Sequence, residues 1–325
     1  SAGGVLSGRI LVTGGRGFIG RRLVTALQAD GACPRVLTRQ TPAAPSEVQG
    51  DVTDVTALAR ACEGVETVFH CAGHAHAFKT HAADEIARHW AVNFEGSVRL
   101  IDAAAAAGVR RLVFLSSVKA AGEPGDAQAD ETWSAAPEGA YGAAKRAAEA
   151  ALLEAGGRHG LHVVILRPVM VYGAGGRGNL ERMARLVRRG CFPPLPETGN
   201  RRSVIHVDDV VSALRVVASD PRAAGRTYIL AHPIACSGRA LYDELRRVMG
   251  LAPIAWAVPA RLLQAAAWLA DGCGGLAGLH LPFNGEVLDR LLGSACYSSE
   301  RIRTELGWQA RVALADGLKE MLGGR

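Results

Sequence analysis

The chain has 325 residues, of which 49% are hydrophobic and 21% charged, and this composition excludes an intrinsically disordered protein. Its 37 basic residues exceed its 31 acidic residues by only 6 and are scattered along the chain, so we expect no nucleic-acid binding. The small positive balance suits a substrate that carries phosphates.

Residues 9–172 alternate short β-branched runs with stretches rich in alanine and leucine, a pattern typical of βαβ units. Two helices are expected at 17–31 and 91–108, and each ends on a glycine in the C-cap position. Right-handed crossovers between such units predict an α/β fold with a doubly wound parallel sheet of the Rossmann type. The predicted strands are RILVTG, RVLTR, VETVFHCAG, RRLVFLSS and HVVILRP.

After Tyr172 the alternation loosens, and a strand-like RRSVIHV with a helix DDVVSALRVVAS returns only near residue 201. We therefore predict two lobes. The dinucleotide-binding domain would comprise residues 1–172 plus about 201–232. A smaller, mostly helical substrate lobe would comprise residues 173–200 plus 233–325.

Three further features of the sequence bear on compartment and membrane. Seven cysteines without a C-x-x-C pair favour buried free thiols in a reducing cytoplasm. The N-terminus enters a strand pattern almost at once, so we expect no secretory signal and a cytoplasmic location. Residues 254–270 are apolar but are interrupted by Pro259, Arg261 and Gln264, which predicts a partly buried amphipathic helix and no membrane span.

A glycine loop directly follows the first strand and opens the first helix, the context that a dinucleotide-binding loop requires. The unpaired N–H groups and the positive dipole at the helix N-terminus would face a pyrophosphate. A tight strand-to-helix turn without a ligand is the alternative. The candidate cofactor residues of the loop are Gly14, Arg16, Gly17, Phe18, Ile19 and Gly20.

The second strand ends in Arg39 without an acidic residue, and an arginine at this place accommodates the 2′-phosphate of NADP. Arg39, with Arg16, therefore favours NADP(H), and NAD(H) stays possible because Arg39 could be an ordinary solvated residue. Asp51 and the adjacent Val52 are candidates for the adenine end of the cofactor. An ordinary turn aspartate is the alternative for Asp51.

Tyr141 and Lys145 stand one helical turn apart on the same face of a predicted helix. A cation beside a phenol favours the phenolate, so we expect Lys145 and an oxidised nicotinamide to lower the pKa of Tyr141 toward working pH. Tyr141 could then exchange a proton with a substrate oxygen while the cofactor exchanges hydride. The required hydroxyl partner is expected from Ser116 or Ser117 at a strand end, where serines also serve purely structural roles.

The chain contains, in this order, the segments TGGRGFIG, VFHCAG, AVNFEG, FLSSVKAAGE, YGAAK, RPVMVYG and RSVIHVDDV. This order is typical of the extended short-chain dehydrogenase/reductases. The chain resembles this nucleotide-sugar epimerase/dehydratase family over essentially its whole length. The resemblance implies that Ser117, Tyr141 and Lys145 are catalytic. It also implies that Ala72, Gly73 and Asn93 line or support the cofactor site, with Tyr141 and Lys145.

On the substrate side, the resemblance maps Asn179, Arg202 and Arg290 onto groups that hold a nucleotide diphosphate, preferably of a UDP-sugar. For Arg290, a surface charge on a helix is the alternative. Arginine suits this task through bidentate, charge-assisted contacts to phosphate. His76 is a candidate substrate contact. A metal site at His74 and His76 is not expected, because no carboxylate or cysteine set accompanies them. His206 is expected to be structural, with Asp208 and Asp209 as cap and dipole partner of the next helix.

The departures from the family narrow the expected reaction. Sugar 4,6-dehydratases carry an Asp-Glu pair where this chain has Val118 and Lys119, so water elimination lacks its acid and base. The S-S-V-K-x-x-G-E form resembles UDP-4-keto-6-deoxy-N-acetylhexosamine reductases and nearby 4-epimerases. Because Arg39 favours an exchangeable NADPH, we expect a UDP-4-keto-sugar reductase, with a UDP-hexose 4-epimerase holding NAD tightly as the alternative.

More distant alternatives also stay open. A non-catalytic NADP-binding protein would require a broken set of catalytic residues, and here all three are present. Flavonoid-like ketones or cholesterol-type alcohols are other substrates that the same fold can take. A homodimer that pairs through helices of the dinucleotide-binding lobe is possible.

Overall fold

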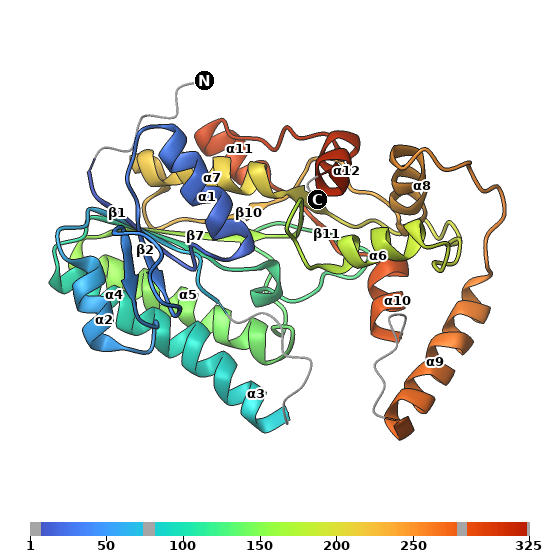
Figure 1. The fold of residues 1–325 in the computed structure, drawn as a ribbon, viewed down its shortest axis with the longest axis horizontal. Helices are drawn as coiled ribbons and strands as arrows, with labels where there is room; N and C mark the ends of the chain where they lie inside the picture. The colour runs from blue at the N-terminus through green and yellow to red at the C-terminus, as the bar shows by residue number, and fades with distance from the viewer. Residues whose placement is uncertain (1–7, 74–81, 278–284, 324–325) are drawn as a thin grey trace.

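A parallel sheet of seven strands forms the centre of the fold (Figure 1), and its strand order is β3-β2-β1-β4-β5-β7-β10. The structure is a computed structural model that describes residues 8–73, 82–277 and 285–323. The order reverses between β1 and β4, as in doubly wound sheets, which confirms the predicted fold class. The strands are β1 (Ile10–Thr13), β2 (Arg35–Thr38), β3 (Glu47–Gln49), β4 (Thr67–His70), β5 (Arg111–Leu115), β7 (His162–Pro168) and β10 (Thr227–Leu230).

Helices cover both faces of the sheet, and successive strand residues enter opposite cores. Ile10 and Val12 of β1 pack into one core, whereas Leu11 packs into the other. The first core lies under α1 (Phe18–Ala29) and α7 (Val207–Ser219), and the second lies under the helices on the opposite face (Figure 1). The latter are α2 (Val55–Cys62), α4 (Gly96–Ala106) and α5 (Gly139–His159).

The ends of two helices follow the sequence expectation, but the start of one does not. Gly31 after α1 and Gly108 after α4 have φ of +85° and +75°, the left-handed conformation that glycine adopts without strain. The helix expected from residue 91 instead begins with a π-helix, Trp90–Glu95, which continues α3 (Ala82–His89) and runs into α4. Such wide turns occur frequently at functional sites.

Two short strand pairs connect the sheet to a third core at the C-terminal end. β8 (Met170–Tyr172) pairs with β9 (Val204–His206), and β6 (Gln128–Ala129) pairs with β11 (Cys296–Tyr297). The third core, including Tyr172, Leu195 and Leu318, joins the remaining helices. These are α6 (Asn179–Arg188), α8 (Gly238–Val248), α9 (Ala260–Ala277), α10 (Gly285–Leu292) and α12 (Leu314–Gly323). The division of the chain into two lobes stays a prediction.

The last part of the chain also returns to the first core. Ile302 of α11 (Glu300–Leu306) and Trp308 pack in the same cluster as Ile10 and Val12 of the first strand. Both residues are buried, with Ile302 fully enclosed. The two ends of the sequence therefore contribute to one hydrophobic core.

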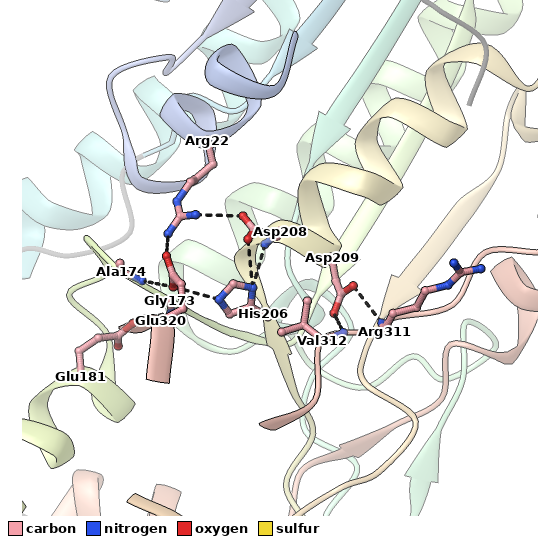
Figure 2. Close-up of polar contacts among 10 residues, drawn as sticks. All are labelled: Arg22, Gly173, Ala174, Glu181, His206, Asp208, Asp209, Arg311, Val312 and Glu320. Atoms are coloured by element: carbon pink, nitrogen blue, oxygen red, sulfur yellow. Dashed lines mark hydrogen bonds and ion pairs between the residues drawn. The ribbon is translucent and has the colours of Figure 1, made fainter. Parts of the chain in front are cut away.

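The cap of α7 differs from the sequence expectation. His206 is the N-cap residue, and its ring Nδ1 accepts a hydrogen bond of 3.3 Å from the backbone N–H of Asp208. The expected cap role of Asp208 is therefore wrong. Asp209 accepts hydrogen bonds of 2.9 and 3.0 Å from the backbone N–H groups of Arg311 and Val312 instead (Figure 2).

Two expectations about apolar segments and thiols are corrected in part. The helix expected over 254–270 begins only at Ala260; Leu263 and Ala267 are buried, whereas Trp268 is exposed. Within residues 8–73, 82–277 and 285–323, none of the helices has the length and apolar character that a bilayer crossing requires. The expectation of buried thiols is wrong for Cys33 and Cys191, which are free and exposed.

Candidate active site

The carboxyl ends of β1, β4 and β5 lie side by side at one end of the sheet, and the candidate site residues follow these strands. Thr13 of β1 pairs with His70 of β4, and β5 ends next to β4. Because these parallel strands end level with one another, the segments after them meet at this edge. The segments are the glycine loop 14–20, residues 71–73 and the pair Ser116–Ser117.

The glycine loop has the tight geometry that a pyrophosphate requires. Gly14 has φ of +70°, and a Cβ built on it would lie 2.6 Å from the backbone nitrogen of Ala72. A Cβ built on Gly20 would lie 2.1 Å from the carbonyl oxygen of Gly14, so no side chain fits there. Gly17 caps α1 without a side chain, which leaves the N–H groups at Phe18 and the following residues to a ligand. The loop fits a dinucleotide cofactor.

A buried row of hydrogen bonds links the glycine loop to Asn93. Thr13 Oγ lies 2.7 Å from His70 Nδ1, His70 Nε2 lies 2.8 Å from Ser97 Oγ, and Ser97 donates to the carbonyl oxygen of Asn93 at 2.8 Å. Burial, and to a lesser extent Lys145, lowers the pKa of His70 to about 3, so the ring is neutral. A neutral ring with Nδ1 accepting from Thr13 and Nε2 donating to Ser97 satisfies the whole row. Sequence reasoning missed His70.

The residues expected around the adenosine are already paired with carboxylates. Arg16 forms a bidentate ion pair with Glu47, at 2.9 Å from Nε and 2.7 Å from Nη2. This pair lowers the pKa of Glu47 to about 2. Arg39 is 81% exposed, and its Nε lies 3.9 Å from Asp51 Oδ2. Arg16 is therefore engaged by Glu47, and Arg39 is the arginine left to meet a 2′-phosphate in this part of the described chain.

The other candidate cofactor residues are Val52, Gly73 and Asn93, and close contacts define their surroundings. Val52 is buried against Gly96, where a built Cβ would lie 2.7 Å from Val52 Cγ2. A Cβ built on Gly73 would lie 3.1 Å from Asn93 Oδ1 and 3.3 Å from Lys145 Nζ. The structure thus brings Gly73, Asn93 and Lys145 together. Their contacts with a cofactor stay a prediction.

The candidate catalytic residues meet above the end of β5. Tyr141 is hydrogen-bonded to Ser117, and Lys145 Nζ donates to the carbonyl oxygen of Leu115 at 3.0 Å. The same Nζ lies 5.9 Å from the centre of the Tyr141 ring. Ser116 is excluded as the partner hydroxyl, because it is buried and donates to Glu149. The arrangement suits proton exchange between Tyr141 and a substrate oxygen held by Ser117.

Burial has the largest effect on the pKa of Tyr141. Burial raises the pKa of Tyr141 to about 12, and the hydrogen bond with Ser117 opposes this only in part. Lowering of this pKa by Lys145 together with an oxidised nicotinamide stays a prediction.

Glu149, one helical turn from Lys145, favours the charged form of that lysine. Burial lowers the pKa of Lys145 to about 8, opposed by Cys71 and Glu149. Burial also raises the pKa of the Cys71 thiol to about 12, so this thiol is uncharged where Lys145 titrates. Glu149 is thus the anion that favours the ammonium, held in place by Arg167 at 2.6 Å. The sequence signal for Glu149 was its i+4 spacing from Lys145.

We expect Glu149→Gln to move the alkaline limb of the pH–activity profile to lower pH. Loss of the anion lowers the pKa of Lys145 further, so the ammonium disappears at lower pH. Activity should fall roughly three- to tenfold near pH 8 and change little near pH 6.5. The control is Glu154→Gln on the same helix, an exposed residue 3.9 Å from Arg158. An unshifted profile in Glu149→Gln would show that Lys145 does not depend on Glu149.

A cavity of about 240 Å³ extends from the candidate catalytic edge to the C-terminal helices. Ser117 lines one part of it, and Asn179, Arg202 and Arg290, the residues expected to hold a diphosphate, line it as well. Arg202 is oriented by a hydrogen bond of 3.1 Å from Nη1 to the carbonyl oxygen of Gly293. His76 lies outside the described residues. The structure therefore brings the other three substrate candidates together with Ser117.

Sequence reasoning missed several charged residues of the same cavity. Arg177 precedes Asn179 in the loop and adds to the positive charge. Glu123 and Glu138 supply carboxylates, and burial raises the pKa of Glu138. Their proximity could not be read from the sequence because they follow different elements. With these carboxylates in the cavity, the presence of Val118 and Lys119 no longer excludes an acid and a base for water elimination.

Comparisons with known proteins identify a matching family and several relatives of the chain. Residues 10–231 match the model of the NAD dependent epimerase/dehydratase family. The chain is 29% identical to the UDP-glucose 4-epimerase of Vibrio cholerae, over 96% of this chain and 93% of that protein. It is 28% identical to a 3 beta-hydroxysteroid dehydrogenase/Delta 5→4-isomerase of Mycobacterium tuberculosis, over 97% and 90%.

A solved structure extends the similarity to the whole fold. MoeE5 in complex with UDP-glucuronic acid and NAD aligns with a TM-score of 0.76 and 25% identity, covering 98% of both chains. Together with the family match over more than half of the chain, this leads to one conclusion. The chain belongs to the NAD dependent epimerase/dehydratase family.

Proposed function

We propose that the protein is a UDP-hexose 4-epimerase that keeps NAD bound between turnovers. The observation that carries this proposal is the cavity that joins Ser117 to Arg202 and Arg290. One end of it offers the hydroxyl beside Tyr141, and its arginines suit a diphosphate. The similarity to the UDP-glucose 4-epimerase of Vibrio cholerae over nearly the full chain supports position 4 of a UDP-hexose as the site of reaction.

The protein's own residues divide the chemistry among them. The glycine loop, residues 14–20, would hold NAD, which would supply reversible hydride transfer at carbon 4. Tyr141 accepts the proton of the 4-hydroxyl and later gives it back, and Ser117 holds the oxygen by a hydrogen bond. The Lys145 ammonium favours the phenolate of Tyr141. Arg202 and Arg290 hold the diphosphate while the sugar presents each face in turn.

A UDP-4-keto-sugar reductase is the second candidate, and the exposed Arg39 is the observation that favours it. An exchangeable NADPH would need a cation for its 2′-phosphate. The ion pair between Arg16 and Glu47 weakens that argument, because it engages the other arginine on which the NADP expectation depended. A tightly held NAD therefore fits this end of the site better.

The steroid dehydrogenase relative suggests a different substrate class, which the cavity does not favour. Besides Arg202 and Arg290, the cavity is lined by Arg177, Arg182 and Lys119. Glu123 and Glu138 offset part of this charge, and Glu138 lies 3.9 Å from Lys119. A steroid brings no charge to complement the remaining excess of basic residues, whereas a nucleotide diphosphate does. The formation of a homodimer and the choice between NAD and NADP as cofactor stay predictions.

The proposal predicts that the purified protein interconverts UDP-glucose and UDP-galactose without added cofactor. NAD(H) should be released on denaturation, close to one equivalent per chain, and identified by its absorbance. Protein that arrives free of cofactor, binds NADPH better than NADH and reduces a UDP-4-keto-sugar would refute the epimerase and support the reductase. Absence of both activities, with turnover of a hydroxysteroid, would reject nucleotide-sugars altogether.

A further inference from the structure

The loop 173–178 between β8 and α6 has two sides with different surroundings. Arg177 and Gly178, with the adjacent Asn179, line the substrate cavity. Gly173, Gly175 and Gly176 line a smaller cavity of about 180 Å³ behind the loop. The position of the cavity-facing residues therefore depends on what holds the rear of the loop.

Two carboxylates from outside the loop hold its rear by backbone hydrogen bonds. Glu320 Oε2, from α12, accepts from the N–H of Ala174 at 2.9 Å. Glu181 Oε1, from α6, accepts from the N–H of Gly173 at 3.3 Å. A hydrogen bond to a carboxylate is stronger than one between neutral groups, and of these two bonds the one from Ala174 is the shorter.

Glu320 also joins the loop to two elements of the dinucleotide-binding lobe (Figure 2). Its carboxylate pairs with Arg22 of α1 and lies 3.1 Å from Nε2 of His206 at the start of α7. Arg22 lies two residues after the end of the glycine loop, and its Nη1 lies 3.1 Å from Oδ1 of Asp208. The Arg22, Ala174 and His206 contacts together lower the pKa of Glu320 although burial opposes them, so it is a carboxylate.

Close packing fixes α12 where Glu320 can make these contacts. A Cβ built on Gly317, one turn before Glu320, would lie 2.6 Å from the Tyr172 hydroxyl oxygen and 2.9 Å from Cδ2 of His206. Leu318 is fully buried in the third core. A Cβ built on Gly173, whose φ is +148°, would lie 2.7 Å from Val207. The helix, the loop and the start of α7 are thus in direct contact.

We propose that Glu320 is a positioning residue for substrate binding: it fixes loop 173–178 against the cofactor helix α1 and so places Arg177 and Asn179 for the diphosphate. The inference rests on the proposed function for the identity of the ligand. The binding energy of the diphosphate then depends on a carboxylate that never touches it. Glu181 supports the same loop from its own helix.

The test compares Glu320→Ala with Glu320→Gln. The alanine variant removes the acceptor for Ala174, so the Kd of UDP and the KM of the UDP-hexose should rise about tenfold, with kcat and the content of NAD(H) within about twofold of wild type. The glutamine variant keeps an oxygen acceptor for Ala174 and should recover most of the affinity. UDP binding is measured by titration calorimetry, independently of turnover.

The matched control is Asp316→Asn on the same helix, an exposed carboxylate 3.9 Å from Lys319, which should bind UDP as wild type does. If Glu320→Ala folds poorly, Gly317→Ala serves as the second variant. It pushes α12 away from Tyr172 and should cause the same loss of UDP affinity. Unchanged UDP affinity in a folded Glu320→Ala protein would overturn the inference and leave the proposed function standing. A rise in KM of about tenfold, accompanied by a fall in kcat of about tenfold and a lower Tm, would also overturn it, because the effect would then be purely structural. Failure of the wild type to bind UDP would refute both.

Discussion

Tyr141→Phe should lower kcat about a thousandfold and leave the binding of UDP within about twofold of wild type. The substitution removes the group that exchanges a proton with the 4-hydroxyl, and such general acid–base catalysis contributes about a hundred- to ten-thousandfold. Because the ring is retained, its packing near Lys145 and His89 is preserved. The measurement is steady-state turnover of the UDP-hexose, with bound NAD(H) determined on the same preparation.

The control for Tyr141→Phe is Tyr228→Phe. The Tyr228 hydroxyl donates to Glu305 at 2.6 Å, on the far edge strand of the sheet, and lies outside the candidate site. This variant should keep wild-type kcat. A Tyr141→Phe protein that retains more than about a tenth of wild-type kcat would show that another group carries the proton.

Arg202→Met should lower kcat/KM for the UDP-hexose about a hundredfold. Methionine keeps much of the length and the apolar stem but removes the guanidinium, so the charge-assisted hydrogen bonds to the diphosphate are lost, each worth about 1.5–3 kcal/mol. Burial lowers the pKa of Arg202, but an arginine stays charged at neutral pH. The loss should fall mainly on KM and on the Kd of UDP.

Arg201→Met is the control for that experiment, because Arg201 is the adjacent residue and is exposed. It should bind UDP as the wild type does. If Arg202→Met retained full affinity for UDP, the diphosphate would not lie against Arg202. The proposed role of Arg202 would then fail, and the other arginines of the cavity, Arg177, Arg182 and Arg290, would have to hold the diphosphate.

The parts of the site that the sequence predicts are those set by local rules. Strand ends in a parallel sheet lie at one edge, so residues 14–20, 71–73 and Ser117 could be placed together from their order alone. Likewise, the helical period puts Tyr141 and Lys145 on one face. These inferences need no knowledge of how distant segments pack.

The parts that escaped prediction depend on contacts between residues far apart in the chain. Glu47 pairs with Arg16, which lies 31 residues earlier in the chain, and Glu320 accepts a hydrogen bond from Ala174, which lies 146 residues earlier. No local pattern marks either carboxylate. The preference for NADP failed to account for Glu47 for this reason. The cap of α7 was misassigned to Asp208 because the ring of His206, two residues earlier, accepts the bond from the Asp208 N–H.

The first core has a consequence for biosynthesis. It needs Ile10 and Val12 from the first strand and also Ile302 and Trp308 from the last part of the chain. A ribosome conceals the most recently made residues, so a nascent chain cannot complete this core until Trp308 has left the ribosome. Until then its partly formed sheet exposes apolar surface, and such intermediates of larger proteins are prone to aggregate. We therefore expect the protein to depend on chaperones during synthesis, and truncation before Trp308 to yield insoluble product.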